Sequence, residues 1–228
     1  MSDARKSGWE PASARVDVVR VEPTPEGGAG HFGVREWERL VRFGELLVEQ
    51  GELRGLIGPR ELDRLWSRHL LNSTAVSEFV PNGMRIADVG AGAGFPGMVL
   101  AISRPDLDVD LIEPMERRTD WLQFITDELA LENVNVIRAR AEDLPKTYAV
   151  DVVTARAVAA LKKLLPWTLP LLKPGGRLVA LKGQRAEIEV AEAEKQLMKY
   201  RAQSARTMDV DVWGTDEGTR VVEVVKMK

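Results

Sequence analysis

The chain has 228 residues, of which 44% are hydrophobic, and a formal net charge of −3 at pH 7. This length and apolar content suit one α/β domain with an extension. Because cysteine is absent, disulfides, a thiolate zinc site and a thiol nucleophile are excluded, and the slightly acidic balance argues against a chain devoted wholly to nucleic-acid binding. The chain has only two histidines, so we expect no metal site. Because it has no apolar run of roughly 20 residues and no signal-peptide core, we expect a cytoplasmic protein without membrane contact. We also expect a monomer.

The N-terminal part of the chain divides into a polar segment and two helical patterns. Residues 1–30 end in EPTPEGGAG and predict a flexible tail. Residues 34–50 carry apolar side chains at helical spacing, and Pro59 suits the first position of a second helix. The apolar side of this second helix is expected to comprise Leu62, Leu65, Trp66 and Leu70. We therefore expect an N-terminal helical extension over residues 31–80.

From residue 84 onward, patterns typical of strands and helices alternate. Strands are predicted at 84–89, 109–113, 134–139, 150–155 and 176–182, helices at 97–103, 116–131 and 186–200, and a closing hairpin of strands at 208–213 and 219–227. Such alternation predicts a mostly parallel sheet with helices on both faces, and the hairpin gives it an antiparallel C-terminal edge. The fold class is therefore Rossmann-like α/β.

The stretch DVGAGAGFPG, residues 88–97, follows the first of these strands. Its second half fits the G-x-G-x-x-G pattern of dinucleotide-binding proteins, and Glu113 lies 21 residues after Gly92, where such proteins place a ribose-binding acid. A plain strand-to-helix turn is the structural alternative. The choice between ligands depends on the residues around the glycines.

Two of those residues disfavour a dinucleotide. Asp88 at the strand end would repel a pyrophosphate, and Pro96 lacks a backbone N–H that a phosphate would use. S-adenosylmethionine has no phosphate, and its ammonium and sulfonium groups favour a nearby acid. Glu113 can still accept hydrogen bonds from the ribose hydroxyls. We therefore expect S-adenosylmethionine as the cofactor.

The sequence RAED, residues 140–143, follows the third predicted strand. In this topology the corner lies over the adenine of the cofactor. Glu142 or Asp143 could accept a hydrogen bond from the adenine amine, while the Ala141 backbone could read the ring edge. A helix N-cap at Asp143 is the structural alternative.

The fourth predicted strand ends in DVVTARA, residues 151–157, where methyltransferases face their substrate. It lacks the Asn/Asp-Pro-Pro-aromatic pattern of adenine-N6 enzymes, and without cysteine the chain cannot activate a pyrimidine at C5. Guanine N7 remains possible because its lone pair loses no proton on attack and needs no general base. Catalysis of that reaction consists mostly of alignment.

Several segments, in order, resemble the glucose-inhibited division protein B family of bacterial methyltransferases, which act on guanine N7 of 16S ribosomal RNA. These segments are RHLLNS (68–73), DVGAGAGFPGMVLAI (88–102), LIE with ERR (111–118), RAED, DVVTARA and GGRLVALKG (175–183). The chain departs from many members at 47–66, where they carry an Asn-Leu-Thr segment. The resemblance implies a methyltransferase core over 81–228 and a cofactor site lined by Gly90, Phe95, Glu113, Ala141, Glu142 and Arg156.

Basic residues lie near the expected site in three groups. They are Arg60, Arg64 and Arg68, which recur every four residues, Arg117 and Arg118 after the second strand, and Lys182 and Arg185 after the fifth. The first group would share one helix face, and the others lie at the carboxyl edge of the sheet. We expect them to contact RNA, although the first group could also be a solvated helix face. Arg156 could instead pair with Glu142 or Asp88.

The predicted function is transfer of a methyl group from S-adenosylmethionine to N7 of a specific guanine in 16S ribosomal RNA, free or within the small ribosomal subunit. Cofactor binding is assigned to Asp88, Gly92 and the six residues that the resemblance implies. Arg156 and Lys182 are candidates for positioning groups, and no residue is expected to act as a base. The alternatives are a methyltransferase for a small molecule or a protein, and a nonenzymatic module that binds S-adenosylmethionine or RNA.

Overall fold

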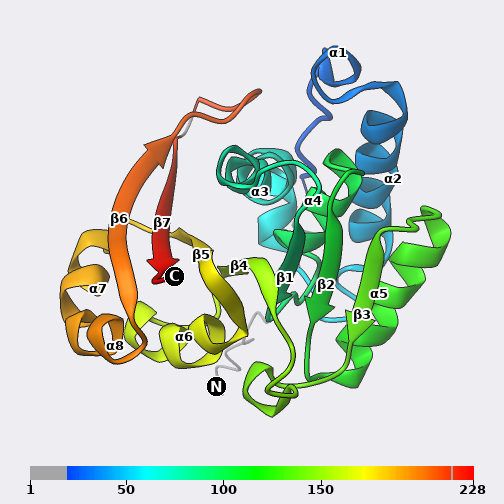
Figure 1. Cartoon of the computed structure of the whole chain (residues 1–228). Helices are drawn as coiled ribbons and strands as arrows, with labels where there is room; N and C mark the ends of the chain where they lie inside the picture. The colour runs from blue at the N-terminus through cyan, green and yellow to red at the C-terminus, as the bar shows by residue number, and fades with distance from the viewer. Residues whose placement is uncertain (1–19, 217) are drawn as a thin grey trace, which may run out of the picture.

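The computed structural model describes residues 20–216 and 218–228. Its centre is a seven-stranded sheet with the order β3-β2-β1-β4-β5-β7-β6 (Figure 1). The strands are β1 (Arg85–Val89), β2 (Asp108–Ile112), β3 (Val134–Ile137), β4 (Val150–Arg156), β5 (Leu172–Lys182), β6 (Ala202–Val210) and β7 (Thr219–Lys226). The first five are parallel, whereas β7 runs antiparallel between β5 and β6. The predicted fold class is confirmed.

The strand order reverses between β1 and β4. Asp88 of β1 lies opposite Leu111 of β2 on one side and Thr154 of β4 on the other. In open α/β sheets, ligands bind in the crevice at the carboxyl ends of the strands, where the order reverses. The topology therefore directs the search for a site to the loops that follow β1, β2, β3 and β4.

Helices cover both faces of the sheet, because its parallel strands are rich in buried aliphatic side chains (Figure 1). One hydrophobic cluster joins the sheet to α2 (Val34–Gln50), α4 (Gly97–Ser103) and α5 (Glu116–Glu128). The other joins it to α6 (Leu161–Thr168), α7 (Ala186–Glu192) and α8 (Glu194–Lys199). The predicted N-terminal extension thus shares the core of the sheet domain.

Two helical predictions differ from the structure. The alternation did not predict α6, whose sequence LKKLLPWT contains Pro166 inside the helix. The helix predicted at 186–200 is divided into α7 and α8, because the backbone at Ala193 has φ −96° and ψ 3° and leaves helical geometry. In the described ranges, no helix is both long and apolar enough to cross a membrane.

Part of the predicted flexible tail is anchored to the domain. Residues 1–19 lie outside the described residues. Within 20–30, the Glu22 carboxylate accepts hydrogen bonds from the backbone N–H groups of Trp66 and Ser67, at 2.7 and 2.9 Å. The Glu22 N–H donates to the Leu62 carbonyl at 2.8 Å, and a short helix, α1 (Gly28–Phe32), follows. The tail prediction is therefore wrong for residues 20–30.

The second helix of the extension is irregular. It consists of η1 (Pro59–Arg64, a 3₁₀ helix), η2 (Leu65–Leu71, a π-helix), α3 (Asn72–Thr74) and η3 (Ala75–Phe79, a 3₁₀ helix). Arg64, with φ −134° and ψ 25°, breaks the helix, and Glu22 satisfies the N–H groups that the break frees. The expected apolar residues are buried: Leu62, Leu65, Trp66 and Leu70. A spacing of four residues, however, does not define one face across a 3₁₀ helix.

Candidate active site

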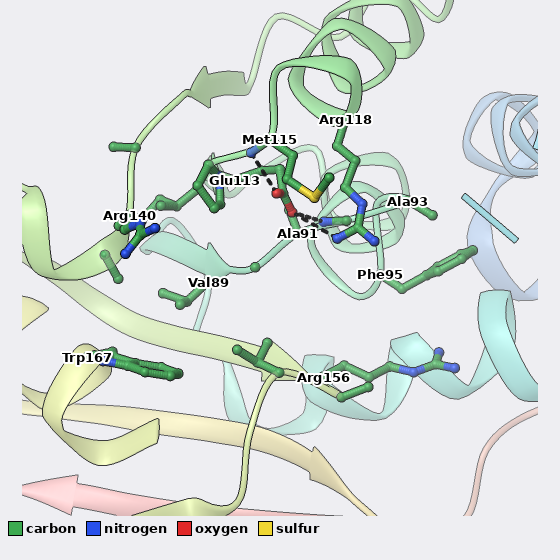
Figure 2. Close-up of a pocket in the computed structure, with 18 of the residues that line it drawn as sticks. Val89, Ala91, Ala93, Phe95, Glu113, Met115, Arg118, Arg140, Arg156 and Trp167 are labelled. Atoms are coloured by element: carbon green, nitrogen blue, oxygen red, sulfur yellow. Dashed lines mark hydrogen bonds and ion pairs between the residues drawn. The ribbon is translucent and has the colours of Figure 1, made fainter. Parts of the chain in front are cut away.

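A cavity of about 620 Å³ opens at the carboxyl edge of the sheet, where the strand order reverses. The loops after β1, β2, β3 and β4 form its walls (Figure 2). Seven of the residues predicted for the cofactor site line it: Gly90, Gly92, Phe95, Glu113, Ala141, Glu142 and Arg156. The eighth, Asp88, does not. The sequence therefore predicted the walls of this cavity, and their role in binding remains a prediction.

The glycine loop after β1 needs glycine for its backbone and for its packing. Gly90 and Gly94 have φ values of 75° and 111°, in the left-handed region that other residues rarely adopt. A Cβ atom on Gly90 would lie 2.8 Å from the Val158 side chain, and one on Gly94 would lie 2.9 Å from Cβ of Met98. The loop can therefore pass close to the segment after β4 and to α4 only with glycine at these positions.

Glu113 follows β2 and ties the glycine loop to the second strand. Its side chain is 2% exposed, and its two oxygens accept hydrogen bonds from the N–H groups of Gly92 at 3.0 Å and Met115 at 2.9 Å (Figure 2). Arg118 lies 3.7 Å from the same carboxylate. Since each carboxylate oxygen has two lone pairs, Glu113 can still accept hydrogen bonds from a ligand in the cavity.

Asp88 lies beneath the glycine loop rather than in the cavity. It is fully buried, and its Oδ2 accepts a hydrogen bond from the Gly97 N–H at 2.8 Å. Within residues 20–216 and 218–228, Oδ1 has no hydrogen-bond partner. Burial, opposed by the hydrogen bond from Gly97, raises the pKa of Asp88 to about 7. The structure thus gives Asp88 a place in loop support, unlike the direct cofactor contact expected from its position.

The corner after β3 forms a second wall of the cavity. It holds a short 3₁₀ helix, η4 (Ala141–Asp143), in which Ala141 is buried and Glu142 is exposed. Arg140 precedes this helix, which has no side-chain cap, so the N-cap considered for Asp143 does not form. Trp167 of α6 lines the cavity across from the loop after β2 (Figure 2). Sequence reasoning missed Trp167 because it did not predict α6.

Arg156, at the end of β4, is held by a histidine that sequence reasoning did not assign. Its guanidinium donates to Nδ1 of His69 at 2.8 Å and to the His69 carbonyl at 3.3 Å. Nε2 of His69 lies 2.9 Å from a Glu61 oxygen. The guanidinium also lies 5.5 Å from the ring centre of Phe95. The ion pairs of Arg156 with Glu142 or Asp88, considered from the sequence, are not among its contacts in the described chain.

These contacts specify the protonation state of His69. Burial and the charge of Arg156 lower the pKa of His69 to about 4, so the imidazole is neutral at pH 7. Because Nδ1 accepts from Arg156, the proton is on Nε2 and is donated to Glu61. This hydrogen bond lowers the pKa of Glu61. Burial and the charge of Arg68 lower the pKa of Arg156 to about 10, which leaves it charged.

The buried imidazole makes stability depend on pH. Unfolded His69 binds a proton near pH 6.5, whereas folded His69 does so only near pH 4, so its contribution to the free energy of unfolding decreases as pH falls from 6.5 towards 4. The His69→Gln variant lacks this contribution, so the free energy of unfolding of the wild type minus that of the variant should decrease from pH 7 to pH 5. The raised pKa of Asp88 acts in the opposite direction, but it is common to both proteins and cancels in the difference. Urea unfolding of both proteins at each pH gives the two free energies of unfolding, and a difference between them that does not change from pH 7 to pH 5 would contradict the assignment. Between pH 7.5 and 8.5 this difference should stay constant.

A second cavity of about 540 Å³ adjoins the first, and the two share Arg156, Ala157 and Val158 as lining residues. It has a basic lining that comprises Arg64, Arg68, Arg156 and Lys182. Lys182 donates to the Ala159 carbonyl at 2.7 Å and to Glu189 at 2.8 Å. The structure therefore brings together Arg64, Arg68 and Lys182, three of the residues predicted to contact RNA.

The other predicted RNA contacts lie elsewhere. Arg118 lines the first cavity, beside Glu113. Arg60 and Arg117 are exposed, and Arg185 is exposed with its guanidinium 3.9 Å from Glu192. Arg64 and Arg68 line the second cavity, but Arg60 does not, because a spacing of four residues does not place side chains on one face of the 3₁₀ helix η1. The described residues contain no group of three or more His, Asp or Glu side chains that could hold a metal ion.

Together, the parallel sheet, the glycine loop, the acid after β2 and the adjoining cavity define a methyltransferase of the Rossmann-like class. Solved structures agree on the fold. A SAM dependent methyltransferase from Aquifex aeolicus is similar with a TM-score of 0.53 and 22% identity over 77% of this chain and 97% of that chain. M. jannaschii TYW2 in complex with AdoMet gives a TM-score of 0.55 and 20% identity over 70% and 76%.

The sequence comparisons then identify the family. The model of the family GidB, rRNA small subunit methyltransferase G, matches residues 36–212. Ribosomal RNA small subunit methyltransferase G of Beutenbergia cavernae is 56% identical over 81% of this chain and 87% of the relative, and that of Thermobifida fusca is 51% identical over 80% and 77%. The chain belongs to this family of enzymes, as its motifs had indicated.

Proposed function

We propose that the protein transfers a methyl group from S-adenosylmethionine to N7 of one guanine in 16S ribosomal RNA. The observation that carries the proposal is the pair of adjoining cavities. One is bordered by the glycine loop and Glu113, the other is lined by cations, and Arg156, Ala157 and Val158 belong to both. Such an arrangement suits a methyl donor in the first cavity and a nucleic-acid base in the second, with the two meeting at the shared lining residues.

The first cavity fits S-adenosylmethionine better than a dinucleotide. A pyrophosphate would need free backbone N–H groups at the glycine loop. Here, however, carboxylates already occupy two of them: Glu113 accepts from Gly92, and Asp88 accepts from Gly97. The acidic loop instead favours a ligand with cationic groups. This is the chemical reason to prefer a methyl donor.

Each part of the cofactor has a matching element in this cavity. Glu113 would hold the ribose hydroxyls, the backbone around Gly90 and Gly92 would hold the methionine part, and Ala141 with Glu142 would border the adenine. When bound, S-adenosylmethionine supplies an electrophilic methyl group on a sulfonium. The protein's own residues bind it and orient it towards the second cavity.

The groups near the lining residues that the two cavities share are consistent with a reaction that needs no general base. His69 lines the first cavity as a neutral imidazole, but its Nδ1 lone pair is occupied by Arg156 and its Nε2 proton by Glu61. Asp88 is buried beneath the loop. Guanine N7 carries no proton to remove, so binding and alignment are sufficient for the reaction. The residues would act by holding the base with N7 towards the cofactor.

The lining of the second cavity supports an RNA substrate. Arg64, Arg68 and Lys182 converge there, and cationic side chains of this kind bind the phosphates of nucleic acids. Given the family, we infer that the substrate is 16S ribosomal RNA, free or assembled in the small subunit. The remaining question is which atom of that RNA receives the methyl group.

The site of methylation can be located chemically. N7-methylguanosine becomes open to strand scission by aniline after reduction. Small-subunit RNA from cells that lack the gene should lose one such cleavage, and the purified protein with S-adenosylmethionine should restore it. The rate of restoration should show no steep acidic limb from a catalytic base near neutral pH. Label transferred to adenine N6, to a ribose hydroxyl or to protein would contradict the proposal and leave the fold unaffected.

A further inference from the structure

Glu189 stands out in the second cavity. It belongs to α7, and it is the only acidic residue among the described residues that line this cavity. The same lining contains four cationic residues, Arg64, Arg68, Arg156 and Lys182. Its side chain is 21% exposed. A carboxylate is out of place in a surface that serves only to attract phosphates, because it would repel them. Its position therefore calls for a second explanation.

Local contacts keep Glu189 charged and fixed. Its Oε2 accepts hydrogen bonds from the Leu161 N–H at 2.7 Å and from Nζ of Lys182 at 2.8 Å. Burial is the largest single effect and raises the pKa of Glu189, but the hydrogen bonds from Lys182 and Leu161 together with the charges of Lys182 and Arg185 hold this pKa below its ordinary value. Both hydrogen bonds are to Oε2. Oε1 therefore remains able to accept from a ligand in the cavity.

The chemistry of the bases matches this acceptor to guanine. On its Watson–Crick edge, guanine presents two adjacent donors, N1–H and the N2 amine, whereas O6 and N7 are acceptors. Adenine and cytosine present one amine beside an unprotonated ring nitrogen, which a carboxylate repels, and uracil presents a single N–H between two carbonyl oxygens, which a carboxylate also repels. Enzymes that modify a base read an extruded nucleotide through hydrogen bonds to this same edge. A fixed carboxylate thus favours guanine over the other bases.

We propose that Glu189 selects the target guanine by accepting a hydrogen bond from its N2 amine, while a cation of the cavity faces O6 and N7 points towards the cofactor. This inference rests on the proposed function. It differs from a purely structural role, in which Glu189 would only fix Lys182 and the N-terminal end of α6. The two roles predict different responses to a change of a single atom group in the RNA.

The test uses small-subunit RNA with either guanosine or inosine at the methylated position. Inosine lacks only the N2 amine and keeps N1–H, O6 and N7. For the wild-type protein, inosine should lower kcat/KM by about 10- to 100-fold, the range for losing a hydrogen bond to a charged group. For Glu189→Ala the penalty should shrink to about twofold, because the carboxylate that contacts the amine is gone. Thermal unfolding and cofactor affinity report whether the variant is folded.

Two further variants separate selection from structure. Lys182→Met breaks the same ion pair but keeps the carboxylate, so its inosine penalty should persist even if its activity falls. Glu192→Gln changes a neighbouring glutamate outside the cavity and should leave the penalty at the wild-type value. An inosine penalty that is absent in the wild type, or equal in wild type and Glu189→Ala, would overturn the inference. Failure of the wild type to methylate guanosine at N7 would instead overturn the proposed function, and this inference with it.

Discussion

Replacing Glu113 with alanine should weaken S-adenosylmethionine binding by about 1–3 kcal/mol, roughly a 5- to 150-fold rise in Kd. The side chain is expected to bind the ribose, and it also accepts the N–H groups of Gly92 and Met115. Its loss removes a ligand contact, frees two backbone donors and leaves Arg118 without the carboxylate that lies 3.7 Å away. Titration calorimetry with S-adenosylmethionine measures the change.

A neighbouring glutamate provides the matched control. Glu116 lies three residues further along, is 66% exposed and pairs with Arg138 at the surface. Glu116→Ala should leave cofactor affinity unchanged, since exposed ion pairs contribute little. Glu113→Gln should fall between wild type and Glu113→Ala, because an amide has one acceptor oxygen instead of two. Unchanged affinity in a folded Glu113→Ala variant would remove Glu113 from the site.

The first cavity was largely predictable because its signals are local. Glycines with φ above zero recur within one short loop, and the acid after β2 follows from the periodicity of two strands. Parallel strands place their carboxyl ends at one edge, so the loops that carry Gly92 and Glu113 had to meet. The hydrogen bond between them joins residues that are 21 positions apart, within one strand-helix-strand unit.

Other parts of the site depend on contacts that sequence spacing does not reveal. His69 and Arg156 are 87 positions apart, and only the packing of the irregular extension on the sheet brings them together. That irregularity itself depends on Glu22, which satisfies two N–H groups 44 and 45 positions away. The apparent arginine stripe assumed a continuous α-helix, and this distant carboxylate helps to stabilise the break.

Asp88 illustrates a second limit. Its position in the sequence suggested contact with the cofactor, whereas in the structure it is buried on β1 and bonds to Gly97. Alternation along a strand determines which side of the sheet a residue faces, but it does not reveal what the following loop covers. Asp88 and Glu113 thus hold the glycine loop from two directions, one beneath it at Gly97 and one beside it at Gly92.

Substituting alanine for Gly97 should therefore be among the most damaging single changes, lowering the free energy of unfolding by about 3 kcal/mol. A Cβ atom there would lie 2.5 Å from Cδ2 of Leu111 and 2.6 Å from both Cβ and Oδ2 of Asp88. Both neighbours are buried on paired strands and cannot move away without disturbing the sheet. Any movement of Asp88 that relieved this contact would also strain the hydrogen bond that its Oδ2 accepts from the Gly97 N–H.

Urea unfolding of Gly97→Ala, followed by tryptophan fluorescence, should give a lower midpoint with an unchanged slope, because the surface exposed on unfolding stays the same. Gly30→Ala is the matched control: a Cβ atom at Gly30 meets no atom within 4 Å, and the residue lies in α1. Alanine there should be neutral or stabilise the protein by about 0.4–1 kcal/mol. A Gly97→Ala midpoint equal to that of the wild type would mean that the loop can move away from Asp88. The two-sided support by Asp88 and Glu113 would then not hold the loop in place.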